Sequence, residues 1–229
     1  MDGKIILKNV SKVYQKGKIK VEALKNINLE IEKGEFVVIM GPSGSGKTTL
    51  LNIIGCLDIP TEGEIIYNGK TLKNLSEDEL SEYRKQNISF IFQSFNLIPV
   101  LTVKENIELP LVIEKHLSLK EKEKRVLELI EKVGLSGMQD RYPYELSGGQ
   151  EQRVAIARAL VKKPLVVLAD EPTANLDSQT AIEIIQIMRE MNEKEKTTFI
   201  FSTHDPKIEK FAKRIIILKD GSIYSDMRI

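Results

Sequence analysis

A single glycine-rich segment combines the residue types that bind the phosphates of a nucleotide. Eight of its residues fit the pattern G-x-x-x-x-G-K-[ST], and Thr49 follows them; the eight are Gly41, Pro42, Ser43, Gly44, Ser45, Gly46, Lys47 and Thr48. Glycines allow backbone N–H groups to turn inward around phosphate oxygens. The ammonium of Lys47 can neutralise the β- and γ-phosphates, and the hydroxyl of Thr48 suits Mg²⁺. The segment therefore predicts a site for a nucleoside triphosphate and Mg²⁺.

Two adjacent carboxylates supply the second part of this chemistry. Asp170 and Glu171 directly follow the apolar run Leu165–Ala169. An acidic residue at the end of such a strand helps to hold Mg²⁺ in phosphate-loop enzymes, which is the role expected of Asp170. Glu171 would point toward the γ-phosphate, where a carboxylate can orient and deprotonate the attacking water. Together the two segments predict a nucleoside triphosphatase, and they leave open whether it is a kinase, a GTPase or a motor.

Both segments need buried strands to hold them in place. Short runs rich in Val and Ile alternate with helical patterns, which is typical of an α/β protein with a buried sheet. The expected strands are Ile5–Val10, Glu35–Met40, Ile88–Phe92, Leu165–Ala169, Thr198–Ser202 and Arg214–Leu218. The glycine-rich segment would join the second of these strands to a helix over Thr48–Ile54. Tight turns are expected at Lys33-Gly34, Asn68-Gly69 and Asp220-Gly221.

The middle of the chain has a different pattern. No glycine occurs from Phe95 to Val133, and apolar residues recur at helical spacing within Leu119–Val133. We therefore expect one domain over residues 1–229. Its core would comprise about residues 1–93 and 161–229, with a helical insert of about residues 94–160.

Composition restricts the classes of partner and compartment. The 34 Lys and Arg nearly balance the 33 Asp and Glu, leaving a formal net charge of +1, so nucleic acid is not an expected partner. The single cysteine, Cys56, excludes an intrachain disulfide and fits a reducing compartment. No uncharged apolar run reaches about 18 residues, so we expect a cytoplasmic protein, or one that sits on a membrane without crossing it.

A short motif narrows the class of enzyme. It consists of Leu146, Ser147, Gly148, Gly149 and Gln150, and a helix is expected soon after it over Val154–Leu160. Small residues at a helix N-terminus expose N–H groups and a hydroxyl, which again suits an anion. The motif resembles the signature of ABC ATPases, and the resemblance extends over essentially the whole chain. It implies an α/β phosphate-loop core with a mostly parallel sheet, an antiparallel β subdomain and a helical insert.

The resemblance also implies roles for individual residues. Tyr14 would stack on adenine, and Phe should serve almost as well because the ring face does the stacking. Gln93 would contact Mg²⁺ and link to a membrane subunit, His204 would contact the γ-phosphate, and Asn175-Leu176-Asp177 would pass between two subunits. The expected catalytic residues are Glu171, His204 and Lys47, and the expected metal ligands are Thr48, Gln93 and Asp170. The nucleotide would contact Tyr14, the segment from Gly41 to Thr49, Gln93, and the residues Ser147 to Gln150.

An assembly follows from this resemblance. Ser147 and Gly149 of one chain would cover the γ-phosphate held by residues 41–48 of another, so two ATP molecules would join two copies head to tail. Closure of this homodimer would move an integral membrane permease. The expected docking region is Gln93–Leu111, where apolar residues are either exposed for the partner or packed inside the insert; they are Phe95, Leu97, Ile98 and Leu101.

Two further stretches narrow the family. Residues 51–63 and 92–99 resemble those of lipoprotein-release, macrolide-export and antimicrobial-peptide-resistance ATPases. In that branch the permease typically has a large extracytoplasmic domain. The alternative is a soluble ABC ATPase, although these usually carry two cassettes or a long coiled-coil insertion. We therefore expect an ATP-hydrolysing subunit of an ABC transporter, bound peripherally at the inner face of the cell membrane.

Overall fold

The computed structural model describes residues 3–114 and 116–229. Its strands are β1 (Ile5–Lys16), β2 (Ile19–Ile31), β3 (Phe36–Met40), β4 (Glu62–Tyr67), β5 (Lys70–Thr71), β6 (Ile88–Ile91), β7 (Val166–Asp170), β8 (Thr198–Thr203), β9 (Arg214–Lys219) and β10 (Ser222–Arg228). Its α-helices are α1 (Lys47–Ile54), α2 (Glu77–Asn87), α3 (Val103–Glu108), α4 (Leu119–Lys132), α5 (Gly148–Leu160) and α6 (Ser178–Glu195). Short 3₁₀ helices occur at Leu109–Leu111, Pro143–Glu145 and Pro206–Phe211. Each predicted strand is present.

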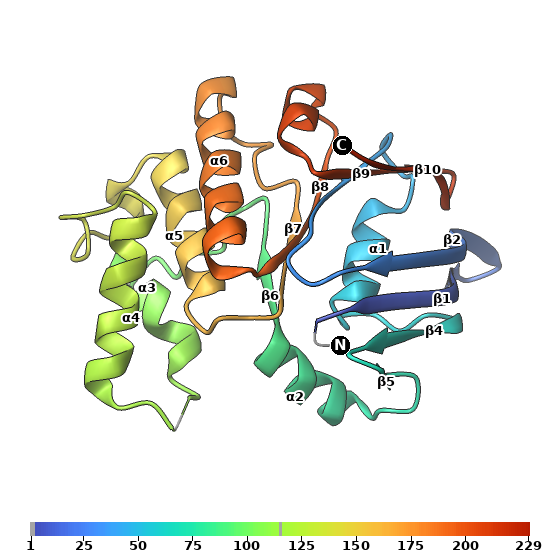
Figure 1. The fold of residues 1–229 in the computed structure, drawn as a ribbon, viewed down its shortest axis with the longest axis horizontal. Helices are drawn as coiled ribbons and strands as arrows, with labels where there is room; N and C mark the ends of the chain where they lie inside the picture. The colour runs from blue at the N-terminus through green and yellow to red at the C-terminus, as the bar shows by residue number, and fades with distance from the viewer. Residues whose placement is uncertain (1–2, 115) are drawn as a thin grey trace.

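A sheet in the order β10-β9-β3-β8-β7-β6 forms the centre of the molecule (Figure 1). The strands from β9 to β6 are parallel, and β10 runs antiparallel to β9. Side chains of β3 alternate between two hydrophobic clusters. Phe36 and Val38 face the side of α3 to α6, whereas Val37 and Ile39 face α1 and the second sheet. Both faces of the strand are buried, which explains its continuous apolar sequence and confirms the predicted α/β core.

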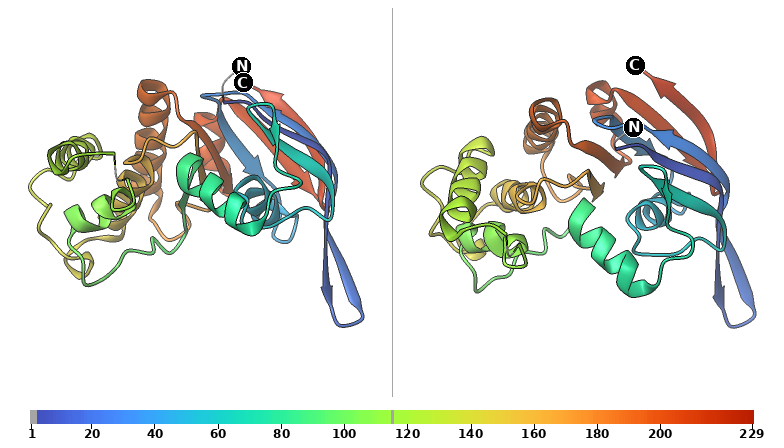
Figure 2. Two further views of the ribbon diagram at one scale, coloured as in Figure 1. Left: turned by 90° about the horizontal axis from the view of Figure 1, so that it is seen from below. Right: turned by 60° about the horizontal axis from the view of Figure 1, so that its bottom comes forward.

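The second sheet is antiparallel, in the order β2-β1-β4-β5, and it packs with α1 on one face of the central sheet. The far end of the β1–β2 hairpin projects beyond the rest of the molecule (Figure 2). Two predicted turns close hairpins, one between β4 and β5 and the other between β9 and β10. Asn68 and Gly69 have φ of 51° and 79°, and Asp220 and Gly221 have φ of 50° and 81°. Positive φ at both central residues is the geometry of a type I′ turn, which favours Asn-Gly and Asp-Gly.

Each helix of the region 94–160 begins at a hydrogen-bonded cap. Thr102, Ser118 and Ser147 each accept the N–H of the residue three positions later, whose side chain accepts the N–H of the cap in return. This capping box sets where α3, α4 and α5 start. Apolar side chains of these helices join one cluster with β7, β8 and α6, so the region has no separate core. The division of the chain into core and insert stays a prediction.

A buried arginine ties the C-terminal strand to the central sheet. Arg214 on β9 donates through Nη1 to Glu35 at 2.7 Å and to the carbonyl of Glu30 at 2.7 Å. Through Nε and Nη2 it donates to both carboxylate oxygens of Asp226 on β10, at 2.8 and 2.7 Å. Only 8% of the Arg214 side chain is exposed. Arg228 reaches the other oxygen of Glu35 at 3.0 Å, but from the surface.

Arg214→Ala is expected to lower the free energy of unfolding by about 3 kcal/mol, because it leaves the partly buried Asp226 without its cation and leaves Glu35 with only the exposed Arg228. Arg228→Ala is the matched control; its side chain is 69% exposed, and a loss below about 1 kcal/mol is expected. Urea unfolding followed by circular dichroism measures both variants. Equal losses would mean that Arg214 contributes no more than a surface ion pair.

Candidate nucleotide site

The glycine-rich segment forms the turn between β3 and α1. Gly41 has φ of 151° and Gly46 has φ of 105°, where residues with a side chain are strained. A Cβ atom on Gly41 would lie 2.3 Å from the carbonyl oxygen of Leu218, and one on Gly46 would lie 2.6 Å from that of Ala23. Packing therefore requires glycine at both positions, and the loop's backbone stays open to a ligand.

Lys47 begins α1, and its side chain turns back into the loop. Its Nζ donates to the carbonyl oxygens of Gly41 at 2.8 Å and Pro42 at 3.0 Å. The next residue, Thr48, donates its hydroxyl to Oδ2 of Asp170 at 2.8 Å. The fold thus joins the glycine-rich segment to the acidic end of β7, 122 residues further along the chain.

A serine that sequence analysis does not assign to the site holds the two carboxylates together. Ser202, fully buried near the end of β8, donates its hydroxyl to Oδ1 of Asp170 at 2.6 Å. The Oγ atom of Ser202 in turn accepts the N–H of Glu171 at 3.0 Å. Asp170 and Ser202 are directly paired in the parallel ladder of β7 and β8. The signal in the sequence is a polar residue at the end of an apolar strand, and only the register shows which strand it faces.

Glu171 has an unusual backbone conformation and lies beside His204. Its φ is 47°, in the left-handed region that costs a residue with a side chain roughly 1–2 kcal/mol. Such strain is found most often at functional sites. Oε1 of Glu171 lies 3.1 Å from Nδ1 of His204, whose imidazole is largely exposed. Both residues line a cavity of about 260 Å³. Two of the predicted catalytic residues are therefore adjacent and open to solvent.

Gln93 follows β6, and its amide pairs with Asn175. Gln93 donates through Nε2 to Oδ1 of Asn175 at 3.4 Å, and Asn175 donates through Nδ2 to the Gln93 carbonyl at 3.0 Å. Asp177 caps α6 by accepting the N–H groups of Gln179 and Thr180. The loop 175–177 is thus held at both ends. A metal contact by Gln93 stays a prediction, and it would require the amide to turn away from Asn175.

Tyr14 lies on β1, in the projecting hairpin. It is 40% exposed, and its hydroxyl donates to Oδ2 of Asp58 at 2.6 Å. The ammonium of Lys12 is 5.0 Å from the centre of its ring. An exposed ring suits base stacking, which stays a prediction for this residue.

The signature motif lies apart from these residues. Ser147 caps α5, with Gln150 accepting its N–H at 2.9 Å. Helix α5 packs on the face of the central sheet opposite to α1 (Figure 1). A Cβ atom on Gly149 would lie 2.5 Å from Cγ2 of Thr180, so glycine allows α5 to approach α6. The structure therefore assembles Lys47, the acidic pair and His204 in one chain, and it places the signature on the opposite face of the central sheet from α1.

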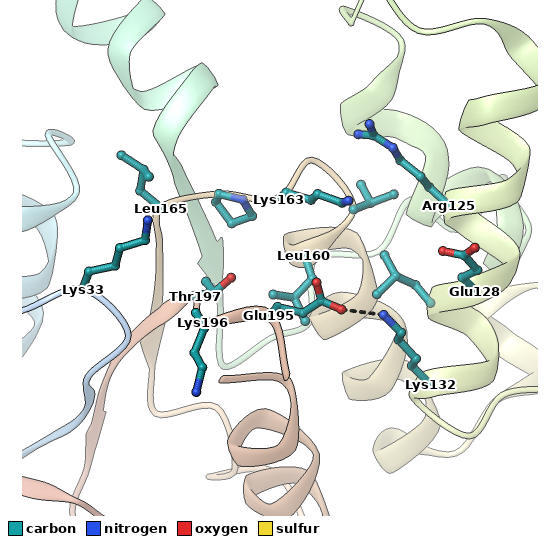
Figure 3. Close-up of a pocket in the computed structure, with 13 residues that line it drawn as sticks. Lys33, Arg125, Glu128, Lys132, Leu160, Lys163, Leu165, Glu195, Lys196 and Thr197 are labelled. Carbon is teal, nitrogen blue, oxygen red and sulfur yellow. Dashed lines mark hydrogen bonds and ion pairs between the residues drawn. The ribbon is translucent and has the colours of Figure 1, made fainter. Parts of the chain in front are cut away.

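A second cavity, of about 240 Å³, lies at the N-terminal ends of β7 and β8 (Figure 3). The glycine-rich loop follows the C-terminal end of β3, at the other end of these parallel strands. Arg125 and Lys132 of α4 line one side of it, and Lys132 pairs with Glu195 at 2.5 Å. No predicted site residue lines this cavity. We take the loop and the groups around Glu171 as the candidate site, because they combine a phosphate cradle with a positioned carboxylate.

Comparison with known proteins bears directly on this site. A family model described as ABC transporter matches residues 24–174. The chain belongs to this family. It is 49% identical over 231 residues to MJ0796, an ABC transporter ATP-binding protein of Methanocaldococcus jannaschii, covering 98% of this chain and 97% of that protein. A solved structure of MJ0796, dimeric and bound to ADP and Pi after hydrolysis, has a TM-score of 0.88 at 49% identity and covers 98% of each chain.

Two export proteins bear on the branch of the family. The macrolide export ATP-binding/permease protein of Bdellovibrio bacteriovorus is 48% identical over 225 residues, which is 98% of this chain but 34% of that longer protein. The bacitracin export ATP-binding protein of Halalkalibacterium halodurans is 43% identical over 219 residues, or 96% of this chain and 86% of that protein. The predicted family, its export branch and the class of enzyme, an ATPase, are confirmed. No described helix is long and apolar enough to cross a membrane.

Proposed function

We propose that this chain hydrolyses ATP at the site around Lys47 and Glu171, and that it moves a membrane subunit by closing onto a second copy of itself. The observation that carries the proposal is a continuous hydrogen-bonded series from Thr48 through Asp170 and Ser202 to Glu171, with His204 beside it. The series connects the phosphate loop to a carboxylate able to activate water. A phosphate-binding loop used only for binding would not need that connection.

The chemistry assigned to each residue follows from its position. Lys47 is already in the loop, where phosphate oxygens can replace the two carbonyls as acceptors of its N–H groups. Glu171 accepts a proton from the attacking water, since both oxygens of Asp170 already accept the hydroxyls of Thr48 and Ser202 and the Glu171 carboxylate does not. The N–H bond to Ser202 fixes the left-handed backbone that directs this carboxylate. His204 lies 3.1 Å from Glu171 and can contact the γ-phosphate from the same side.

The oxygen donors at this site fit Mg²⁺. The Thr48 hydroxyl and the Asp170 carboxylate are 2.8 Å apart, so one ion could contact both. Mg²⁺ commonly takes one or two protein oxygens, with waters and phosphates completing its shell. In the part of the chain that the structure describes, no cluster of three or more His, Cys, Asp or Glu side chains could hold a metal. Bound Mg²⁺ would neutralise charge on the phosphates. Gln93 would become a further ligand beside Thr48 and Asp170 if its amide turned away from Asn175.

A complete site would require two copies of the chain. Ser147 and Gly149 start α5 on the face of the sheet opposite to α1. The N-terminus of α5 in the second copy would therefore cover the γ-phosphate, donating the Ser147 hydroxyl and backbone N–H groups. The two dimeric structures of the relative MJ0796 support this arrangement.

The membrane subunit would dock on the region Gln93–Leu111, and this chain would then lie peripherally at the inner face of the membrane. The structure revises which apolar side chains are available there. The four side chains singled out from the sequence are half-buried, namely Phe95, Leu97, Ile98 and Leu101. Val100 is instead 76% exposed and Leu109 is 40% exposed. The relative whose name includes a permease supports a membrane partner.

Val100→Asp and Leu109→Asp are expected to lower co-purification with the membrane subunit by about tenfold or more, because a charge would enter an apolar contact. A membrane protein encoded by a neighbouring gene would be the candidate for co-expression. Leu119→Asp is the matched control, since Leu119 is 81% exposed on α4, outside the docking region. If both test variants co-purified as well as the wild type, the membrane subunit would not dock on the region Gln93–Leu111. Failure of the wild type to purify with any membrane protein would favour a soluble ABC ATPase.

A further inference from the structure

The loop after α1 carries a carboxylate that is anchored to the phosphate-binding helix. Asp58 lies in this loop, and its N–H donates to the carbonyl of Asn52 at 3.2 Å, as does the N–H of Leu57 at 2.8 Å. Asn52 belongs to α1, which begins at Lys47. The position of Asp58 is therefore set by the same helix that positions the phosphate loop.

Both oxygens of this carboxylate are used by groups of β1 and of its own loop. Oδ2 accepts the hydroxyl of Tyr14 at 2.6 Å. Oδ1 accepts Nζ of Lys12 at 2.5 Å and the N–H of Ile59 at 2.8 Å. Lys12 also donates to the carbonyl of Ile59 at 2.7 Å. The side chains of Lys12 and Asp58 are only 13% and 26% exposed, so water competes little for these charge-assisted bonds.

The protonation states agree with this geometry. Burial acts to raise the pKa of Asp58, but the hydrogen bonds from Lys12 and Tyr14 outweigh it and hold that pKa below its ordinary value. Burial, and then the bond to Asp58, raise the pKa of Tyr14. Near neutral pH the carboxylate is therefore ionised and the phenol keeps its proton, which is the pairing that the donor and acceptor need.

We propose that Asp58 is a positioning residue for the base of the nucleotide: it fixes the ring of Tyr14 at a set place relative to the phosphate loop, and Lys12 fixes Asp58. The inference rests on the proposed role of Tyr14 in stacking on adenine. Without the bond to Asp58, the half-exposed ring of Tyr14 would lose rotational freedom when the base binds, and that loss of entropy would weaken binding. Because this bond already restrains the ring, part of this entropic cost is avoided. The phenolic hydroxyl thereby acquires a function that stacking alone does not give it, so Phe is no longer expected to serve as well as Tyr at position 14.

The test compares a ligand that has a base with one that has none. Binding of ADP is measured by titration calorimetry in the presence of Mg²⁺, and binding of inorganic pyrophosphate by competition against ADP. Asp58→Ala and Tyr14→Phe are each expected to weaken ADP binding about three- to tenfold, the range for one hydrogen bond, and to change pyrophosphate binding less than about twofold. The double variant should bind ADP no more weakly than the weaker single variant, because both remove the same contact. Glu82→Gln, which removes a surface carboxylate paired with Lys85, is the control and should change neither ligand.

Four outcomes would count against the positioning role. Equal losses for ADP and pyrophosphate in Asp58→Ala would mean that Asp58 only supports the fold, and would overturn the proposal. Unchanged ADP binding in both Asp58→Ala and Tyr14→Phe would overturn it as well. Tyr14→Ala separates this inference from the proposed function. If Tyr14→Ala weakens ADP binding and Asp58→Ala does not, only the positioning role fails. If Tyr14→Ala has no effect, the base does not stack on Tyr14 and both fail.

Discussion

Lys47→Ala should lower the rate of ATP hydrolysis at least about a hundredfold, because the variant loses the cation that stabilises charge on the β- and γ-phosphates during transfer. The fold should be retained, since Nζ bonds only to two carbonyls of its own loop. Steady-state release of phosphate measures the rate, and circular dichroism checks the fold. Lys120→Ala, on the exposed surface of α4, is the control for removing a lysine.

The loss expected for Lys47→Ala is specific to the phosphate loop. Lys120→Ala should keep its hydrolysis rate within about twofold, as expected of a surface change that leaves the stability nearly unaffected. If Lys47→Ala hydrolysed ATP at a rate within about twofold of the wild type, the ammonium of Lys47 would have no role in catalysis. The glycine-rich turn would then serve the packing around Gly41 and Gly46 rather than catalysis.

Glu171→Gln should lower turnover by roughly a hundredfold to ten-thousandfold, the contribution typical of a general base. Glutamine has nearly the same size and can still hold a water molecule, but its amide is a far weaker base. ATP binding should be preserved, because Lys47 and Thr48 are unchanged. Single-turnover measurements separate the chemical step from binding. Glu190→Gln, on the exposed side of α6, is the control, and a hydrolysis rate near that of the wild type in Glu171→Gln would assign the base elsewhere.

Local motifs predicted the parts of the site whose chemistry is contained in a few consecutive residues. The loop that ends at Lys47 and the acidic pair at Asp170 both follow buried strands, and an apolar run followed by these residue types is visible in the sequence. The capped start of α5 at Ser147 also depends on neighbouring residues. The sequence alone could therefore assign the family and the α/β fold.

Contacts that depend on strand register could not be predicted in this way. Ser202 joins Asp170 and Glu171 only because β8 lies beside β7 with a particular alignment. Asp58 meets Tyr14 because β1 and the end of α1 pack together, and nothing in either segment specifies the other. The strands β2, β4, β5 and β10 were not predicted, because none of them is a long continuous apolar run. Apolar residues alternate with Lys, Glu and Asn in β2, polar residues interrupt β4 and β10, and β5 has only two residues.

The sequence also could not show which apolar side chains of the predicted docking region are exposed. Phe95 and Leu97 resemble exposed loop residues, because their segment has no regular periodicity. In the structure Leu97 packs against the hydrophobic cluster around α5, while Val100 remains exposed. Which apolar side chains face solvent depends on how the loop folds back over the helices.

In the proposed cycle, ATP joins two copies of this chain until hydrolysis, promoted by Glu171, removes the bridging γ-phosphate. Each γ-phosphate would accept bonds from Lys47 of its own chain and from Ser147 and Gly149 of the other. Such charge-assisted bonds contribute on the order of 1.5–3 kcal/mol each, enough over two sites to raise the association constant by several powers of ten. Without ATP, two nearly neutral surfaces have little to hold them together.

Sedimentation velocity of Glu171→Gln, with and without ATP and Mg²⁺, measures whether ATP joins the two copies. We expect a monomer without ATP and a stable dimer with it, and the wild type should form the dimer only transiently because it hydrolyses the ATP. Adding Ser147→Ala to Glu171→Gln should weaken the dimer while each chain still binds ATP. A monomer under both conditions, even in concentrated samples of Glu171→Gln that bind ATP, would contradict the shared site.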